Sequence, residues 1–130
     1  TGVRLIEQVR EALGKDYFPI FVAEGTSSEK LTRIKHNDYL AKAYRSFSEI
    51  AGALFIYGHS LAENDEHILK KIERGRIDHL FVGIYGDPSS LENRRIVDRA
   101  NRMDVQNRRK KLSVHFYDAA SANVWGKLQI

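Results

Sequence analysis

Apolar residues recur along this chain in two alternating patterns, one with helical spacing and one as continuous runs. Apolar residues three and four positions apart predict amphipathic helices, whereas short continuous runs bounded by glycine, proline or charge predict buried strands. The continuous runs predict strands at 18–23, 53–57, 79–85 and 112–117. The helical spacing predicts helices at 3–13, 26–51 (with a break near 36–38), 64–73, 91–103 and 119–128.

This alternation of strands and helices predicts an α/β domain built from parallel βαβ units. The strands are almost continuously apolar, as in sheets that helices cover on both faces. We therefore expect one Rossmann-like domain over residues 1–130, a three-layer sandwich with about four mostly parallel strands. Two possible capping boxes, Thr26 with Glu29 and Ser89 with Glu92, predict where two of the helices begin.

Composition narrows the class of protein. The chain has 130 residues, a net charge of +4 and no cysteine, so disulfides and zinc–thiolate sites are excluded. No apolar run approaches the roughly 20 residues that cross a bilayer, and no signal peptide is visible, so we expect a cytoplasmic protein without a membrane partner. Arginine and lysine gather between residues 94 and 111. No aromatic residue is interleaved with them, which favours a solvated surface over a nucleic-acid site.

The densest chemical signal follows the strand predicted at 53–57. Gly58, His59 and Ser60 come directly after this strand and precede a predicted helix. Because the carboxyl ends of parallel strands meet at one edge, where ligands bind, this turn is a candidate site. The glycine lets a ligand approach the backbone, the serine donates a hydroxyl, and a helix start favours a phosphate. The polar residues that follow the other strands are expected at the same edge: Glu24, Asp87 and Asp118.

Each candidate residue also has an ordinary structural explanation. Gly58 and Ser60 suit a plain strand-to-helix turn, and Asp65 and Glu66 favour a helix start even where they touch no ribose or reacting group. His59 and His67 stand eight positions apart, which matches no helical pair of metal ligands, so we predict no metal site.

Short motifs at the strand ends resemble the sirtuin-like (silent information regulator-like) family of NAD-binding domains, in particular a bacterial branch of it. Residues 19–24 are similar to the sirtuin strand that reads Pro-x-Val-Val-x-Phe-Gly-Glu, with differences in spacing. Residues 57–61 look like the Gly-Thr-Ser-Leu turn that contacts NAD, with His59 in place of the threonine. Residues 64–68, which follow this turn, are typical of the bacterial branch.

Two later motifs extend the resemblance, which covers about residues 17–125. Residues 85–87 stand where the family has its Ile-Asn-x-Glu turn, near the adenosine ribose. Residues 117–119 resemble the late Gly-Asp-Ala turn near the adenine, with Tyr117 in place of the glycine.

The resemblance implies NAD as cofactor and cleavage of the nicotinamide–ribose bond, by hydrolysis or transfer, in the full protein. The residues that it implies as cofactor contacts are Gly58, His59, Ser60, Asp65, Asp87, Asp118 and Ala119. The chain has no Gly-Ala-Gly-x-Ser loop, no His-Gly turn before the 18–23 strand and no zinc-ribbon cysteines. It therefore resembles the C-terminal part of such a domain, and we expect it to need a missing N-terminal half and to be inactive alone.

Two other functions remain open. Residues 21–25 resemble the strand ending in Glu-Gly of metal-dependent nucleic-acid enzymes of the topoisomerase–primase type. Such enzymes need clustered carboxylates for Mg²⁺, but the next strand here ends in Gly58, His59 and Ser60. A non-catalytic α/β interaction domain is also compatible with the pattern.

An open sheet edge is a further expectation. If the sheet continues into a missing half, one strand carries unpaired backbone groups, and such an edge tends to be covered. The first predicted helix, with Leu5, Ile6, Val9 and Leu13 on one stripe, is a candidate cover. We therefore expect a homodimer, or this helix packed near the open edge.

Overall fold

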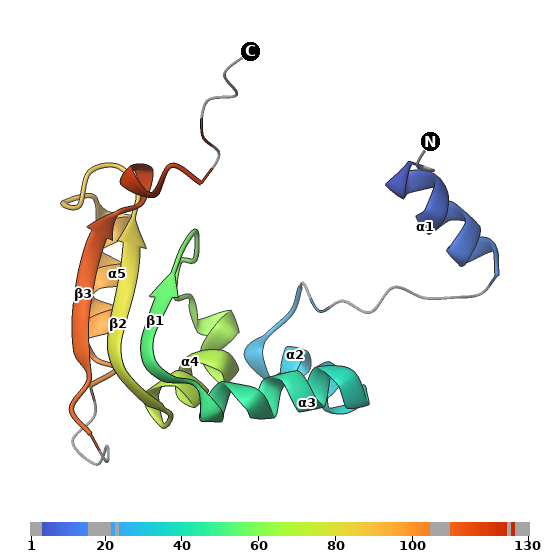
Figure 1. Cartoon of the computed structure of the whole chain (residues 1–130), viewed down its shortest axis with the longest axis horizontal. Coiled ribbons are helices and arrows are strands. Elements are labelled where there is room, and N and C mark those ends of the chain that lie inside the picture. The colour runs from blue at the N-terminus through green and yellow to red at the C-terminus, as the bar shows by residue number, and fades with distance from the viewer. Residues whose placement is uncertain (1–3, 16–21, 23, 105–109, 125, 127–130) are drawn as a thin grey trace.

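The computed structural model describes residues 4–15, 22, 24–104, 110–124 and 126 (Figure 1). Its α-helices are α1 (Leu5–Gly14), α2 (Ser27–Lys35), α3 (Asp38–Ser46), α4 (Glu66–Glu73) and α5 (Leu91–Asn101). Its strands are β1 (Ala51–Ile56), β2 (Arg76–Ile84) and β3 (Ser113–Asp118). Short 3₁₀ turns are η1 (Phe47–Glu49), η2 (Glu63–Asp65) and η3 (Ala119–Ala122).

The sheet is open and parallel, with β2 in the centre between β1 and β3. Leu54 of β1 lies opposite Leu80 of β2, and Leu80 lies opposite Val114 of β3. The predicted α/β class with parallel strands is therefore confirmed. The strand predicted at 18–23 lies outside the described residues, except for Val22.

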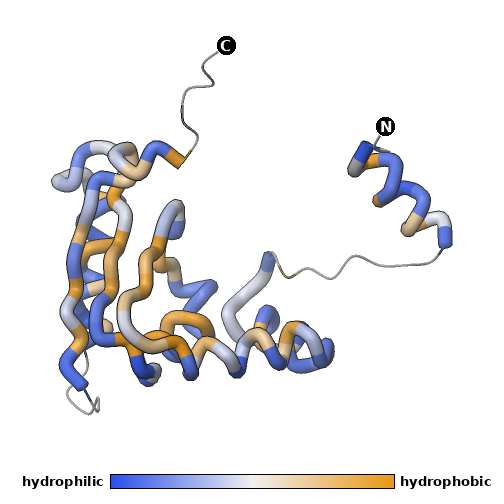
Figure 2. The backbone as a smooth tube through the Cα atoms, viewed as in Figure 1, coloured by the Kyte–Doolittle hydropathy of each residue, from blue (hydrophilic) through white to orange (hydrophobic). Residues whose placement is uncertain are grey.

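One face of this sheet carries the hydrophobic core. Leu80 and Val82 of β2 are fully buried, and they belong to one cluster with Leu69 of α4 and Ala100 of α5. Figure 2 shows apolar residues along all three strands, and Figure 1 shows α4 and α5 behind the sheet. Burial of such side chains contributes about 25 cal/mol per Å² of apolar surface, which makes this face the main source of stability.

The other face of the sheet corrects the three-layer expectation. Within the described residues, helices lie over one face only, so the arrangement is two-layered (Figure 1). Phe55 of β1 is 63% exposed on the uncovered face. The apolar strands misled the prediction, because a run that is apolar throughout is usual for a sheet covered on both faces.

The helix starts follow local hydrogen bonds. Thr26 and Glu29 form the predicted capping box at the start of α2, with the side chain of each accepting from the other's backbone N–H. At α5 the prediction was one residue early, because Ser90 accepts from the backbone N–H of Asn93 and caps the helix. Of the last predicted helix, the described residues show only the turn η3.

Helix α1 lies apart from the sheet (Figure 1). Its apolar side chains Ile6, Val9 and Leu13 are all exposed, so it does not cover the open edge of β1 in this structure. Among the described helices, none combines the length and hydrophobicity needed to cross a membrane.

Candidate functional site

A shallow hollow lies at the carboxyl edge of the sheet, where the sequence predicts a ligand. It has a volume of about 290 Å³ and takes its walls from all three strand ends and from α5. The residues that line it are Tyr57, Gly58, His59, Ser60, Gly83, Tyr85, Ile96 and Ala119. The structure thus brings together four of the predicted contacts: Gly58, His59, Ser60 and Ala119.

The turn after β1 has a backbone shape that depends on its residues. Gly58 has φ of 68°, which suits glycine, and Leu61 has φ of 53°, which is uncommon for a leucine. His59 holds this shape, because its Nδ1 accepts the backbone N–H of Leu61 at 2.9 Å. The Leu61 side chain is buried in the core, so the turn is anchored from both sides.

The second nitrogen of His59 is also occupied. Its Nε2 lies 3.1 Å from Oδ2 of Asp65, and since Nδ1 accepts from Leu61, Nε2 is the protonated nitrogen that donates to the carboxylate. With both ring nitrogens bonded, His59 positions the turn and has no free nitrogen with which to act as a base. The sequence identified His59 as a ligand contact, and the structure gives it this supporting role.

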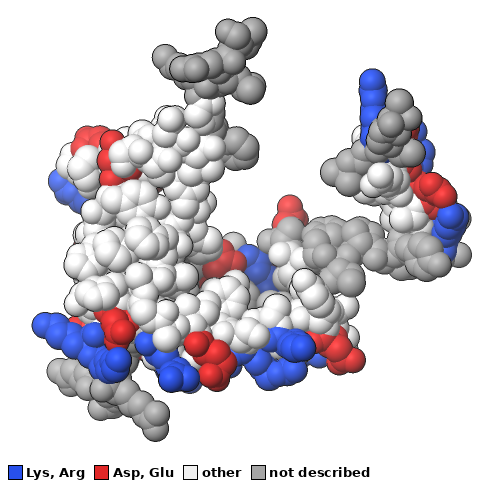
Figure 3. All heavy atoms as spheres, in the orientation of Figure 1, with Lys and Arg blue, Asp and Glu red and all other residues white. Residues whose placement is uncertain are grey.

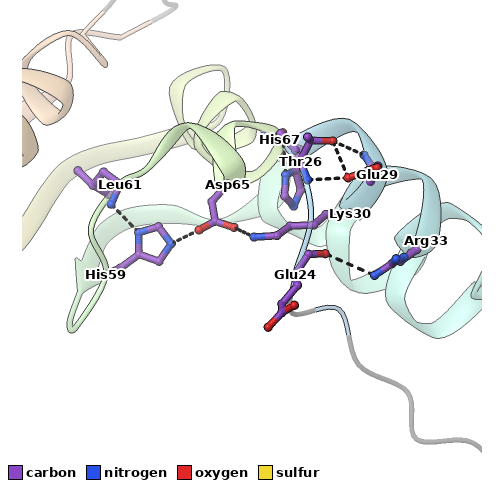
Figure 4. Close-up of polar contacts among 10 residues, drawn as sticks. Glu24, Thr26, Glu29, Lys30, Arg33, His59, Leu61, Asp65 and His67 are labelled. Carbon is purple, nitrogen blue, oxygen red and sulfur yellow. Dashed lines mark hydrogen bonds and ion pairs between the residues drawn. The ribbon is translucent and has the colours of Figure 1, made fainter.

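Asp65 is shared between His59 and a lysine of α2 (Figure 4). Its Oδ1 lies 2.7 Å from Nζ of Lys30, which is only 6% exposed. Burial alone raises the pKa of the Asp65 carboxyl, but the hydrogen bond and charge of Lys30, together with His59, outweigh it and keep the pKa below its ordinary value. Asp65 is therefore charged at neutral pH and braces the turn from outside the hollow.

A second contact joins α2 to α4 beside this group. Ser27 Oγ accepts the backbone N–H of His67 at 2.9 Å and lies 2.9 Å from its ring Nδ1. Burial lowers the pKa of His67 below its ordinary value, and the Asp65 carboxylate opposes this less strongly. His67 is thus neutral at physiological pH and serves packing between helices.

Asp87 and Asp118 follow β2 and β3, so they share the carboxyl edge with Ser60, yet both bond locally. Asp118 accepts the backbone N–H of Ala120 at 3.0 Å and caps η3. Asp87 accepts from the hydroxyl and the backbone N–H of Ser89, which hold its pKa below the ordinary value. Asp118 also lines a neighbouring hollow of about 450 Å³ with Gly86, Pro88 and Phe116.

Glu24 and Glu66 take no part in the hollow. Glu24 is exposed, and its backbone carbonyl accepts from Arg33 at 3.4 Å; the strand predicted before it lies outside the described residues. Glu66 binds Arg99 of α5 at 3.0 Å, and Glu73 binds the same arginine at 2.7 Å. Glu66 and Glu73, both on α4, therefore tie this helix to α5 through Arg99.

Sequence reasoning missed two residues that shape this edge. The Tyr117 hydroxyl crosses β2 and donates to the carbonyl of Ile56 at 3.1 Å, passing over Gly83, whose added Cβ would stand 2.9 Å from the tyrosine ring. Asn93 is buried, and its amide donates to the carbonyls of Tyr85 and Asp87 at 2.9 and 2.7 Å. For Tyr117, the available signal in the sequence was Gly83, because a glycine inside a strand often marks a close approach of another group. No local sequence pattern distinguishes Asn93.

A larger hollow, lined by side chains of both charges, adjoins the candidate site through Ser60. It has a volume of about 500 Å³, and its walls include Arg95 and Arg102 of the α5 segment together with Glu63 and Glu92. The Ser60 side chain is exposed and makes no hydrogen bond within the part of the chain that the structure describes. That same part contains no group of three histidine or acidic side chains arranged to hold a metal.

Comparison with known proteins gives one match. Residues 1–125 match the model of a family described as "Domain of unknown function (DUF4917)". No curated protein and no solved structure matches the chain. The function is therefore inferred from the residues and geometry of the chain itself.

Proposed function

The chain belongs to the DUF4917 family, and we propose that it forms the C-terminal part of a sirtuin-like NAD-binding domain. In this proposal the parallel sheet continues beyond β1, with residues 18–23 as a fourth strand. The observation that carries the proposal is the hollow at the carboxyl edge, which the turn Gly58-His59-Ser60 and Ala119 line together. In open α/β sheets, ligands bind in such a crevice.

The chemistry of the lining suits one part of a nucleotide. Ile96 and the buried Ala119 provide an apolar wall for a base or ribose, and the Ser60 hydroxyl is available to donate to a phosphate or ribose oxygen. Arg95 and Arg102 lie in the adjoining hollow that Ser60 also lines, and they suit the negative charge of a pyrophosphate.

The size of the hollow supports a partial site. Its volume of about 290 Å³ is at the lower end of ligand pockets, which usually measure roughly 300–1,000 Å³, and a dinucleotide extends beyond it. A bound NAD would bring the nicotinamide–ribose bond as the reactive group. In this proposal the described residues bind and orient the ligand, and activation of an attacking group comes from the N-terminal half of such a domain, so we expect no NAD cleavage by residues 1–130 alone.

Nuclear magnetic resonance titration with NAD tests the proposal, because it detects weak binding. We expect shifts of the backbone amides of residues 57–61 and 119. Ser60→Ala should weaken binding at least about tenfold, since a hydrogen bond to a charged group contributes roughly 1.5–3 kcal/mol. Ser28→Ala, on the exposed surface of α2, is the matched control and should bind as the unaltered chain does.

Two results would count against the proposal. NAD at millimolar concentration that shifts none of these amides would remove the nucleotide site. Equal affinities of the Ser60→Ala and Ser28→Ala variants would show that the Gly58-His59-Ser60 turn does not contact the ligand.

A non-catalytic interaction domain is the second candidate, because the structure leaves one whole face of the sheet uncovered. Phe55, 63% exposed, stands on that face in the edge strand β1, beside Phe81 of the central strand. A partner bound to that face would not need a nucleotide in the hollow.

A further inference from the structure

The uncovered face of the sheet is rich in aromatic rings and carries no lysine, arginine or acidic side chain. We call it the open face and define it by Ala53, Phe55, His79, Phe81, Gly83, Ser113, His115 and Tyr117, which lie on the side opposite the core residues of the same strands. None of them is a lysine, arginine, aspartate or glutamate. Figure 3 shows this face of the sheet without charge, and charged side chains gather at its rim.

Aromatic rings form a row across the open face. The rings of Phe55 and Phe81 stack with centroids 4.5 Å apart, and those of Phe81 and His115 stack at 4.6 Å. Because the rings use their planes on one another, they offer edges rather than flat faces to an approaching partner. This geometry suits packing under aliphatic side chains better than stacking with nucleic-acid bases, which needs a free ring plane.

Helix α1 carries a surface of matching character. Ile6, Val9 and Leu13 stand on one stripe and are 64%, 43% and 48% exposed. With 3.6 residues per turn, Glu7 and Glu11 project away from this stripe and Arg10 lies at its flank, and Glu11 pairs with Lys15 at 2.6 Å. The stripe is thus apolar, and the open face that it would contact carries no lysine, arginine or acidic side chain.

The dimensions of the two surfaces agree. A helix of the ten residues in α1 is about 15 Å long and about 10 Å wide. Three strands spaced about 4.8 Å apart, with about six paired residues each, present a face of similar width and roughly 20 Å in length. One helix therefore covers the row of rings.

We propose that the open face of one copy is covered by α1 of a second copy, in a reciprocal two-fold exchange. Within one chain α1 lies away from the sheet (Figure 1), so each copy has one unused stripe and one unused face. In a symmetric exchange, the α1 stripe of each copy covers the open face of the other. No stripe or face is left for a third copy, so the assembly closes as a dimer. Two such contacts also double the buried area, toward the roughly 1,200–2,000 Å² of stable interfaces.

The absence of cysteine from the sequence makes a cross-linking test clean. A Val9→Cys chain is mixed with an Ala53→Cys chain and treated with a short bis-maleimide. We expect a covalent heterodimer across α1 and the open face. The matched control replaces Ala53→Cys by Ser28→Cys, which is exposed on α2 outside the open face, and should give no heterodimer.

A single chain that carries both Val9→Cys and Ala53→Cys separates exchange from folding back. Links between two chains support the proposal. Links confined within one chain would overturn it, because α1 would then cover its own sheet. No link in either experiment would overturn it as well.

Solution mass gives an independent measurement. Light scattering should report a dimer for the unaltered chain and a monomer for Val9→Asp, because a charge in the stripe cannot be buried without a partner. Glu7→Gln, outside the stripe, should remain a dimer. A monomeric unaltered chain, or a Val9→Asp chain that stays dimeric, would overturn the proposal.

Discussion

At the scale of single residues, Gly83 shows how one position shapes the candidate site. It lies in the central strand β2, and the Tyr117 ring from β3 passes over it to reach the Ile56 carbonyl of β1. The absence of a side chain at Gly83 is what lets one tyrosine join all three strands at the edge where the hollow opens. The loss of strand propensity at a glycine is thus offset by a contact that only a glycine allows.

Gly83→Ala should destabilise the protein. The added Cβ would stand 2.9 Å from the Tyr117 ring, so the ring must move and its hydrogen bond to Ile56 is lost. Overpacking of this kind typically costs about 1–3 kcal/mol in the free energy of unfolding. Urea denaturation measures it. Tyr117→Leu removes the ring, so the double variant should lose less than the sum of the two single variants; strict additivity would contradict this explanation.

At the scale of elements, the loop between β2 and α5 is held by a side chain inside the helix. Asn93 of α5 donates two hydrogen bonds back to the carbonyls of Tyr85 and Asp87, and Ser90 caps the same turn. These bonds satisfy backbone groups that the end of β2 leaves without strand partners. The position of Tyr85 at the hollow therefore depends on the first turn of α5.

Asn93→Ala should lower the free energy of unfolding by about 1–3 kcal/mol, because it removes the donor for two carbonyls beside a buried side chain. Urea denaturation of the variant measures the loss. Asn101→Ala, at the exposed end of the same helix, is the matched control and should change stability little. If the two variants lose equal stability, the two hydrogen bonds of Asn93 do not hold the loop.

At the scale of the whole molecule, α2 is attached to the rest of the fold through polar contacts. Lys30 reaches Asp65, and Ser27 reaches His67, so the helix before the sheet braces the turn that lines the hollow. The bracing depends on protonation, because Asp65 must be charged and His67 must be neutral. The pKa of each lies below its ordinary value.

Mild acid should therefore weaken the fold through His67. A histidine whose pKa is lower in the folded than in the unfolded state stabilises the fold fully above its ordinary value of 6.5, and this stability is lost as the pH falls below that value. We expect a lower melting temperature at about pH 5 than at about pH 7.5. His67→Asn, which keeps a polar atom near the position of Nδ1, should reduce the difference in melting temperature between the two pH values. His36→Gln, at an exposed residue that directly follows α2, should leave this difference unchanged. An undiminished difference in His67→Asn would assign the pH effect elsewhere. Protonation of the Asp65 carboxylate weakens the fold only at lower pH, near and below its ordinary pKa of 3.8.

Much of this protein could be read from its sequence by itself. Within the described residues, the order of helices and strands from α1 to β3, the parallel sheet, the Thr26–Glu29 capping box and the position of Gly58, His59 and Ser60 after a strand all follow from the sequence. These features depend on hydrogen bonds and side-chain spacing among near neighbours, and local patterns record such interactions directly.

Only the tertiary structure decided which of those residues meet and what remains uncovered. Lys30 and Asp65 are 35 positions apart, Ser27 and His67 are 40 apart, and Tyr117 and Ile56 are 61 apart. The same holds for the open face, since the continuously apolar strands predict helices on both faces, whereas the described helices cover only one. Contacts over such separations are set by how elements dock, which depends on the shape and packing of the whole chain and leaves no periodic signal in the sequence.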